Sequence, residues 1–207
     1  LADLVTITGS RASTSYGNQV AGELAADSAR DGHIVVGGGG FGIEAGAHRA
    51  AMGAGGDTVA VMAGGVDRAY PAAHADLLSR IADTGLLVSE APPGSAPSRS
   101  RFVARARLMA ALSGATVVVE AGARSGALRV ASQARLLGRA VGAVPGPVVS
   151  AVSTGPHNLL RDHAARIVTN SHDVAALLDD GAQQPPRVGF TMQTPPTLPR
   201  RTPSPGL

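Results

Sequence analysis

Short, continuous apolar runs alternate along most of this chain with longer segments of helical periodicity, and this alternation constrains the fold more than any other feature. Residues 4–8 (LVTIT) and 115–120 (ATVVVE) are clear examples of the apolar runs. The runs are apolar almost throughout instead of at every second residue, which is typical of parallel strands covered on both faces. Right-handed crossovers then predict an α/β fold: a doubly wound, mostly parallel, Rossmann-like sheet in a three-layer sandwich.

The order of the elements locates the expected site. Strands are predicted at residues 4–8, 33–36, 58–62, 86–89, 115–120, 141–144 and, as an edge strand, 166–168. Helices are predicted at residues 16–30, 43–53, 72–83, 101–113, 127–138, 153–162 and 172–179. Because ligands in this architecture bind outside the carboxyl ends of the strands, the loops at 9–17, 37–42, 64–67, 90–100 and 120–126 are the candidates.

Length and composition predict one domain and a tail. The chain has 207 residues, 44% of them hydrophobic, which suits a single core. Residues 1–181 are expected to form the domain, whereas residues 182–207 hold seven of the 14 prolines and are expected to be a disordered basic tail. No apolar run reaches the roughly 18 residues that cross a bilayer, and no signal peptide is visible. A cytoplasmic protein without membrane insertion is expected.

Missing residue types exclude several chemistries. The chain has no Cys, and all 18 basic residues are Arg, which excludes thiolate nucleophiles, Cys-ligated zinc, Schiff-base lysines and the Walker lysine. The six His form no metal-binding spacing, and Ser153, His157 and Asp162 lack the GxSxG elbow that a hydrolase triad of this fold class needs. His48 is expected to be a packed core histidine. We therefore predict no catalytic residue, no metal and no cofactor.

Charge is distributed unevenly along the chain. Residues 1–90 carry five Arg against ten acids, whereas residues 91–161 carry nine Arg against one acid, Glu120. An Arg-rich surface could follow from a composition that avoids Lys, but that does not explain why acids are absent from the middle segment. The asymmetry indicates an anionic partner, either nucleic acid or phosphate.

Two glycine-containing loops after predicted strands are typical of phosphate sites. Gly9-Ser10-Arg11 offers free amides, a hydroxyl and a guanidinium ahead of a helix, although an ordinary strand-to-helix turn has the same pattern. The loop at residues 37–42 (GGGGFG) contains GxGxxG, but the next strand ends without the acid that binds ribose in a dinucleotide site. We therefore expect the amides around Gly38 and Gly40 to hold a phosphate without a cofactor.

Two further segments add candidate anion contacts. Four arginines between residues 99 and 107 crowd one predicted helix, and Phe102 and Met109 are interpreted as part of its buried side. Arg105 and Arg107 are the candidates there for phosphate contacts. Ser125 and Gly126 precede another helix, where they place a hydroxyl and free amides, or simply a helix cap.

Taken in order, these segments resemble the DNA-processing protein A family (DprA/Smf), from about residue 4 to residue 178. The motifs are Gly9-Ser10-Arg11 with Tyr16-Gly17, Gly42-Ile43-Glu44 with Ala47-His48-Arg49, Val66-Asp67-Arg68-Ala69-Tyr70-Pro71, Ser89-Glu90-Ala91-Pro92-Pro93-Gly94, Phe102 with Arg105 and Arg107-Leu108, Val118-Val119-Glu120-Ala121 with Ser125-Gly126, Gly138-Arg139, Val144-Pro145-Gly146-Pro147 and Leu160-Arg161-Asp162. The resemblance implies an extended Rossmann fold, a homodimer, a basic pocket for single-stranded DNA, and loading of the RecA recombinase, without catalysis.

The chain departs from the family pattern at the presumed pocket. Gly39-Gly40-Phe41 and Glu44 stand where the family usually has Leu-Ala, a basic residue and Asp, and Ala106 stands where it has Asn. Ala127 and Val130 replace the usual Ser and Thr. The loss of a cation and of polar donors is expected to weaken binding, or Phe41 supplies base stacking instead.

The leading hypothesis is a non-enzymatic single-stranded-DNA-binding protein of DNA processing, natural transformation and recombination. Its expected binding residues are Gly9, Ser10, Arg11, Gly17, Gly38, Gly40, Phe41, Arg105, Arg107, Ser125 and Gly126. The alternative is a nucleotide-binding enzyme similar to the cytokinin-activating phosphoribohydrolases. The loop at 121–127 lacks the Thr and following Glu of those enzymes, but Glu90 and Glu120 at strand ends keep this alternative open. A nucleotide-binding sensor is a third possibility.

Overall fold

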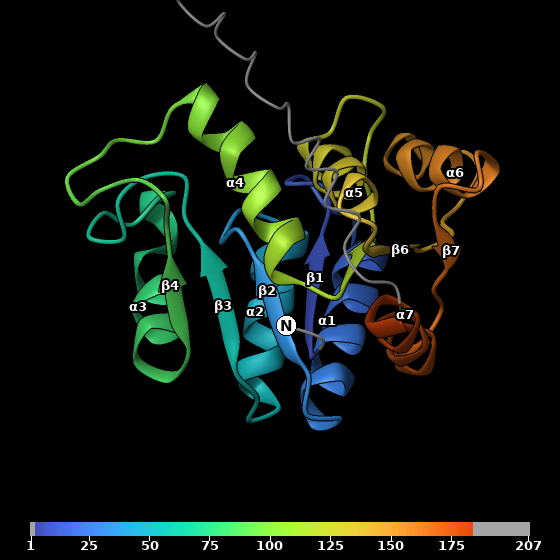
Figure 1. Cartoon of the computed structure of the whole chain (residues 1–207), viewed down its shortest axis with the longest axis horizontal. Helices are drawn as coiled ribbons and strands as arrows, with labels where there is room; N and C mark the ends of the chain where they lie inside the picture. Colours follow the sequence, from blue (N-terminus) through green and yellow to red (C-terminus); the bar gives the residue numbers. More distant parts are fainter. Residues whose placement is uncertain (1–2, 184–207) are drawn as a thin grey trace, which may run out of the picture.

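Seven parallel strands form one sheet in the order β4-β3-β2-β1-β5-β6-β7 (Figure 1). The structure is a computed structural model, and it describes residues 3–183. The strands are β1 (Leu4–Thr8), β2 (Ile34–Gly37), β3 (Thr58–Val61), β4 (Leu86–Val88), β5 (Ala115–Val118), β6 (Ala140–Ala143) and β7 (Arg166–Ile167). The helices are α1 (Ser15–Arg30), α2 (Ile43–Gly53), α3 (Ala75–Thr84), α4 (Arg99–Leu112), α5 (Gly126–Leu136), α6 (Thr154–Arg161) and α7 (Ser171–Gln183).

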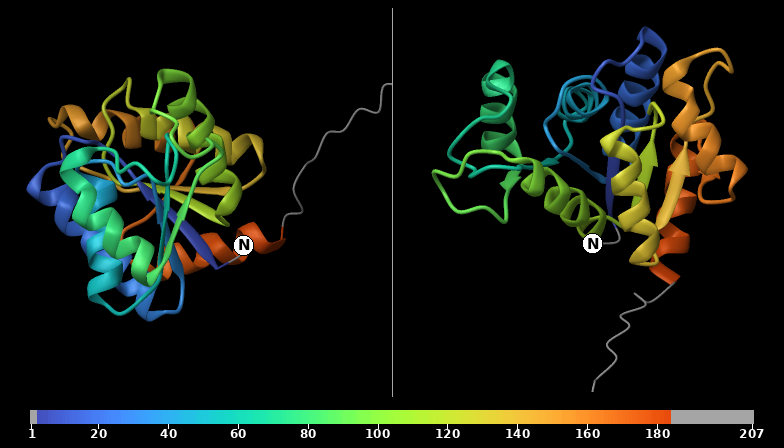
Figure 2. Two further views of the ribbon diagram at one scale, coloured as in Figure 1. Left: turned by 90° about the vertical axis from the view of Figure 1, so that its left-hand side faces the viewer. Right: turned by 90° about the horizontal axis from the view of Figure 1, so that it is seen from above.

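The helices cover the sheet from both sides, so the predicted doubly wound, three-layer fold is confirmed (Figures 1 and 2). Helices α1, α2, α3 and α7 bury their apolar residues on one face of the sheet. Helices α4 and α5 pack on the other face. Helix α4 carries the chain from the edge strand β4 back to β5 in the middle of the sheet, which reverses the direction of winding.

The reversal places the functional loops. Strand β1 pairs with β2 on one side and with β5 on the other, and Thr8 at its end lies opposite Val118. The loops that follow β1 and β5 therefore leave the sheet side by side at its carboxyl edge. In open parallel sheets this switch point is where ligands bind.

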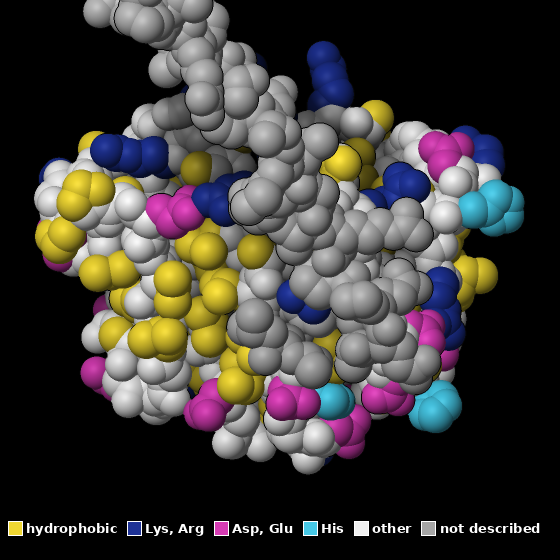
Figure 3. Space-filling model, in the orientation of Figure 1, with side chains coloured by type: hydrophobic (Ala, Val, Ile, Leu, Met, Phe, Trp, Pro, Cys, Tyr) yellow, Lys and Arg dark blue, Asp and Glu magenta, His cyan; other side chains and the backbone are white. Residues whose placement is uncertain are grey.

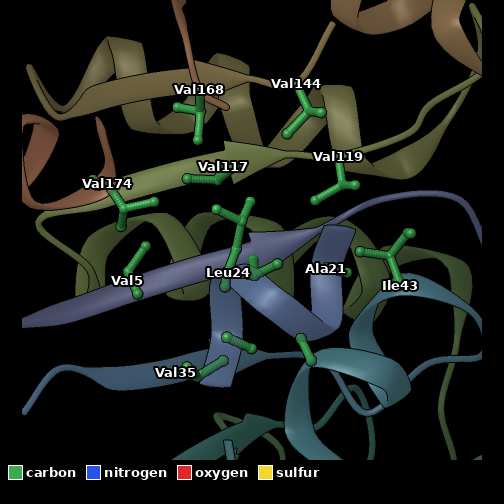
Figure 4. Close-up of a cluster of buried hydrophobic side chains, with 14 of the residues drawn as sticks. Val5, Ala21, Leu24, Val35, Ile43, Val117, Val119, Val144, Val168 and Val174 are labelled. Carbon is green, nitrogen blue, oxygen red and sulfur yellow. The ribbon is translucent and has the colours of Figure 1, made fainter. Parts of the chain in front are cut away.

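Small aliphatic residues build the core, as a chain with 2% aromatics requires. Val5, Val35 and Val117 present one face of the central strands to Leu24 of α1 and to the other apolar residues of the cluster (Figure 4). Buried alanines on both helices line the contact between α1 and α2, so the two helices pack closely.

The predicted elements are all present, with shifted ends. The predicted helix at 72–83 is a 3₁₀ turn, Ala72–His74, followed by α3. The helix predicted from residue 101 begins at Arg99, because the Ser98 hydroxyl caps it by accepting a hydrogen bond from the Arg101 amide at 3.3 Å. Within residues 3–183 no helix is long and apolar enough to cross a membrane. The predicted tail at 182–207 lies almost entirely outside the described residues.

The core histidine predicted from the sequence is confirmed. His48 of α2 is fully buried, and its Nδ1 lies 2.7 Å from the Thr58 hydroxyl. That hydroxyl donates its hydrogen to the Val35 carbonyl, so it can only accept from His48. Nδ1 must therefore carry the proton of the neutral imidazole, and Nε2 is unprotonated. Nε2 has no partner among the described atoms and faces Gly37, where a Cβ would lie 2.7 Å away. Burial lowers the pKa of His48 to about 4.

We expect this histidine to make folding sensitive to acid. The unfolded chain binds a proton near pH 6.5, whereas the folded chain does so only near pH 4. The stability contributed by neutral His48 is therefore present above pH 6.5 and is lost as the pH falls towards 4, by about 3 kcal/mol. Urea unfolding of the parent and of His48→Gln between pH 7 and pH 4 measures this loss. The variant should be less stable at pH 7 but should lose less stability on acidification, whereas His172→Gln, at an exposed position, should follow the parent. Parallel pH curves for the parent and His48→Gln would contradict the assignment.

Candidate functional site

An open cleft of about 850 Å³ lies at the carboxyl edge of the sheet, at the switch point between β1 and β5. The loop after β1, the loop after β5, the start of α5 and one side of α4 form its walls. Its lining includes five arginines, namely Arg11, Arg99, Arg105, Arg124 and Arg129. Among the described lining residues Glu44 is the one acid. Figure 3 shows basic side chains mainly in the upper half of the visible face, above the sheet, and acidic ones mainly along its lower edge.

The amino end of α5 supplies main-chain donors to this cleft. Ser125 is the N-cap of α5, and its hydroxyl accepts a hydrogen bond from the Ala127 amide at 3.3 Å. The first amides of a helix have no intrahelical acceptor and carry the positive end of the helix dipole. Ser125 and Gly126 both line the cleft, so this end of α5 faces the space in which an anion would lie.

Two guanidinium groups lie over the ring of Phe102. The Cζ atom of Arg11 is 5.3 Å from the ring centroid, and that of Arg105 is 5.1 Å away. Arg105 also donates from Nη1 to the Gly38 carbonyl at 2.8 Å, while its buried Nε has no partner in the part of the chain that is described. The ring thus attracts both guanidinium groups and the Gly38 carbonyl also holds Arg105, and neither contact neutralises a charge.

A second, smaller cavity of about 40 Å³ shares this wall. Phe41, Tyr70 and Phe102 line it, together with Pro71, Gly38, Gly40 and both arginines. The ring of Tyr70 lies 5.8 Å from that of Phe102, and Phe41 lies 4.4 Å from His74. His74 is buried, and its Nδ1 lies 2.9 Å from the Gly39 carbonyl. A chain with five aromatic residues gathers three of them here, and the exposed rings of Phe41 and Tyr70 offer an apolar surface beside the arginines.

The glycines at the site make room for functional side chains. A Cβ on Gly38 would lie 2.5 Å from the Arg105 guanidinium, and one on Gly40 would lie 2.8 Å from the Glu44 carboxylate. A Cβ on Gly17 would lie 2.2 Å from the carboxylate of Glu120. A Cβ at any of these positions would therefore displace the guanidinium or carboxylate from the place that it occupies.

Two buried carboxylates lie near the arginines, Glu44 in the lining of the cleft and Glu120 outside it. Glu44, 7% exposed, accepts hydrogen bonds from the Thr8 hydroxyl at 2.8 Å and from the Gly40 amide at 3.0 Å. Glu120, 2% exposed, accepts from the Thr14 amide at 2.9 Å and from the Thr14 hydroxyl at 2.5 Å. Neither carboxylate forms an ion pair with a described residue. Both are thus satisfied by hydrogen bonds and leave the arginines of the cleft without carboxylate partners.

The structure brings together most of the residues predicted from sequence. Gly9, Ser10, Arg11, Arg105, Ser125 and Gly126 line the cleft, and Gly38, Gly40 and Phe41 line the small cavity. Two lie elsewhere. Gly17 is buried beneath Glu120, and Arg107 forms an exposed ion pair with Glu90. The predicted roles of Gly17 and Arg107 in phosphate binding therefore have no support from their positions.

Sequence reasoning missed part of the site. Arg99, Arg124 and Arg129 line the cleft, and Tyr70 lines the small cavity. Phe102, interpreted as part of the buried side of its helix, is half-buried and forms the shared wall. The scarcity of aromatics could have indicated that each of them has a particular role, but no sequence pattern indicated which ones converge.

Comparisons with known proteins agree with the fold described above. The model of the family described as DNA recombination-mediator protein A matches residues 2–179. A putative DNA processing protein DprA from Mycobacterium tuberculosis is 55% identical over 168 residues, which cover 81% of this chain and 43% of that protein. DNA processing protein DprA from Streptococcus pneumoniae is 37% identical over 172 residues, 83% of this chain and 60% of that protein. This chain thus spans less than two thirds of either relative.

Solved structures give the same result. The X-ray structure of DNA processing protein A from Streptococcus pneumoniae superposes with a TM-score of 0.78 at 35% identity, covering 83% of this chain and 60% of that one. A structure of DNA processing protein A from Helicobacter pylori also gives 0.78, at 28% identity, covering 86% and 80%. A molybdenum cofactor binding protein from Rippkaea orientalis, at 17% identity and a TM-score of 0.57 over 85% and 93% of the two chains, shares the fold alone.

Two glycines on α1 allow a matched test of the packing around Glu120. Gly17→Ala should destabilise the protein by about 1–3 kcal/mol, because the added Cβ overlaps the Glu120 carboxylate. Gly22→Ala on the same helix should stabilise it by about 0.5–1 kcal/mol, because that Cβ meets only Ala50, at 3.8 Å. Urea unfolding of both variants measures the difference. Equal effects of the two substitutions would show that the space beside Gly17 is not filled as described.

Proposed function

The chain belongs to the DNA recombination-mediator protein A family, and from this premise we propose that it binds single-stranded DNA in DNA processing and recombination. The observation that carries the proposal is the convergence of Arg11, Arg105 and the amino end of α5 on one cleft. These groups come from three separate stretches of the chain. Guanidinium groups and free amides without carboxylate partners are the donors that a phosphate backbone requires.

The neighbouring aromatic cavity favours a single strand. Arg11, Phe102 and Arg105 line both the cleft and the small cavity, and the rings of Phe41 and Tyr70 beside them are 44% and 43% exposed. A nucleotide whose phosphate lies in the cleft would therefore have exposed aromatic rings near its base. In a single strand the bases are free to stack on aromatic side chains, whereas in a duplex they are stacked inside the helix. Binding through the backbone and through stacking predicts little sequence preference and an affinity that falls steeply with salt.

Relatives support this proposal. The Helicobacter pylori structure, which superposes over most of this chain, is described as showing a single-stranded DNA binding mode of DNA processing protein A. Phe41 lies beside Arg11 and Arg105 in the wall of the small cavity and is 44% exposed, so a ring at this departure from the family pattern fits stacking on a base.

A wider role follows from family membership. We propose that the protein acts in the cytoplasm as a homodimer, and that it loads RecA onto incoming DNA during natural transformation. We further propose that residues 1–181 form one folding domain, and that the basic segment 182–207 adds at most a weak anion contact. Light scattering of the purified chain, with and without a single-stranded oligonucleotide, tests for the dimer.

We propose binding without catalysis. Glu90 and Glu120, the two carboxylates that left the enzyme alternative open, already have partners. Glu120 accepts hydrogen bonds from Thr14, and Glu90 is paired with Arg107. The two Glu44 oxygens accept from Thr8 and Gly40. Incubation with nucleoside monophosphates should release neither free base nor ribose phosphate. Release of either product would favour the enzyme.

Arginine variants test the cleft. Arg11→Ala and Arg105→Ala should each weaken binding of a labelled oligo-dT about tenfold or more, because each removes a charged hydrogen-bond donor. Each should also lower the salt dependence of log Kd by about 0.7, the contribution of one phosphate contact in a single strand. Fluorescence anisotropy over a salt titration measures both quantities, and a duplex of equal length should bind more weakly than the single strand.

Arg107→Ala is the matched control, since it removes the same charge from α4 outside the cleft. It should change the affinity much less than Arg105→Ala and should leave the number of phosphate contacts unchanged. If Arg11→Ala and Arg105→Ala bind as tightly as Arg107→Ala and the parent at every salt concentration, the cleft is not the DNA site.

Phe102→Leu tests base stacking separately from charge. The leucine keeps an apolar side chain at the wall but removes the ring that lies beneath both guanidinium groups. Binding of oligo-dT should weaken about 5- to 100-fold, the usual range for the loss of one stacked base. An abasic oligonucleotide should show little difference between Phe102→Leu and the parent, and a large difference would mean that the ring acts only by holding the arginines.

A further inference from the structure

One residue outside the cleft holds both ends of the loop that carries Arg11. Glu120 is the second residue after β5, and its side chain does not line the cleft. Its main-chain carbonyl accepts a hydrogen bond from the Ser10 amide at 2.6 Å, on one side of Arg11. Its carboxylate accepts from the amide and the hydroxyl of Thr14 on the other side. The five-residue loop from Ser10 to Thr14 is therefore attached to Glu120 at its beginning and at its end.

The same loop is confined from the opposite direction. Gly42 has φ +72°, and a Cβ on it would lie 2.3 Å from the Ser10 carbonyl oxygen. The Ile43 amide donates to that same oxygen at 3.2 Å. Gly17 has no side chain where the Glu120 carboxylate lies, so this carboxylate can approach the first turn of α1. With contacts on both sides, the backbone of Arg11 has little freedom to move.

The charge of Glu120 opposes the binding of a polyanion. By Coulomb's law a carboxylate near the cleft repels phosphate, and taking it out of water has a cost that the hydrogen bonds of Thr14 offset. Any favourable contribution of Glu120 to binding must therefore come from the position that it gives to the loop. Neutralising Glu120 should therefore raise the affinity for DNA if only its charge matters, and lower the affinity if its hydrogen bonds position the loop.

We propose that Glu120 is a positioning residue for nucleic-acid binding, which sets the place of the Arg11 guanidinium by holding Ser10 and Thr14. The proposal rests on the proposed function, because it assumes that Arg11 contacts the DNA. It assigns Glu120 no contact with the nucleic acid. It also gives Thr14, an exposed residue that the sequence analysis did not single out, a part in binding through its hydroxyl.

The first experiment compares two charge-neutralising variants of the full chain. Glu120→Gln keeps the size of the side chain but cannot accept both Thr14 hydrogen bonds, and it should weaken oligo-dT binding about tenfold or less. Glu90→Gln removes an exposed negative charge that is paired with Arg107, and it should leave the affinity unchanged or slightly higher. Unchanged or tighter binding by Glu120→Gln would overturn the proposal, because Glu120 would then affect the affinity through its charge alone or not at all.

The second experiment is a double-mutant cycle. If Glu120 acts through Arg11, adding Glu120→Gln to Arg11→Ala should cause no further loss of affinity. Added to Arg129→Ala, which changes another arginine of the cleft, it should cause its full loss. Equal losses in both backgrounds would show a general structural effect and would overturn the proposal. If Arg11→Ala alone has no effect on binding, the proposed function fails at Arg11, and this result is distinct from a failure of the positioning role.

Thr14 variants test the same hydrogen bond from its other partner, in case Glu120→Gln does not fold. Thr14→Ser retains the hydroxyl and should bind oligo-dT nearly as the parent does, whereas Thr14→Val, which has almost the same shape, should bind less tightly. Thermal unfolding of each variant shows whether the folded fraction is unchanged at the assay temperature. Equal affinities of the Ser and Val variants would show that the hydroxyl bonded to Glu120 has no role in binding.

Discussion

The parallel pairing of β1 with β5 is the interaction on which the rest of this structure depends. It brings together two strands from opposite halves of the chain, and it does so where the direction of winding reverses. The loops after the two strands must then lie side by side. The loop after β1 carries Arg11, and the loop after β5 leads into the amino end of α5, which Ser125 caps. Without this pairing neither loop would have a partner across the cleft.

Close packing behind the cleft keeps its cations free of carboxylate partners. The two nearby carboxylates are bonded to threonine hydroxyls and main-chain amides, and glycines leave the space that they need. Arg105 is held by a carbonyl and an aromatic ring. None of these contacts neutralises a guanidinium, so the positive potential remains available to a ligand. Arg107 lies on the same helix but outside the cleft, where it forms an exposed ion pair with Glu90.

Much of the fold could be predicted from the sequence, because each strand is a local apolar run and each helix a local pattern. The ends of the helices and strands were less predictable. Because Ser98 caps α4, this helix begins at Arg99, two residues before the predicted start. For the site, the loops that carry Gly9, Gly38 and Ser125 were predictable from their place after strands and before helices. The position of Phe102 was not, because helical periodicity alone does not tell a core-facing side from a cleft-facing side.

The sequence by itself therefore determined the order of the elements, the parallel sheet and the concentration of arginines in the middle of the chain. Only the tertiary structure decided which arginines converge, that Gly17 makes room for Glu120, and that three of the five aromatic residues share one cavity. The reason is physical. Secondary structure follows from neighbours along the chain, whereas the direction of a side chain and its choice of partner depend on residues that only packing brings near.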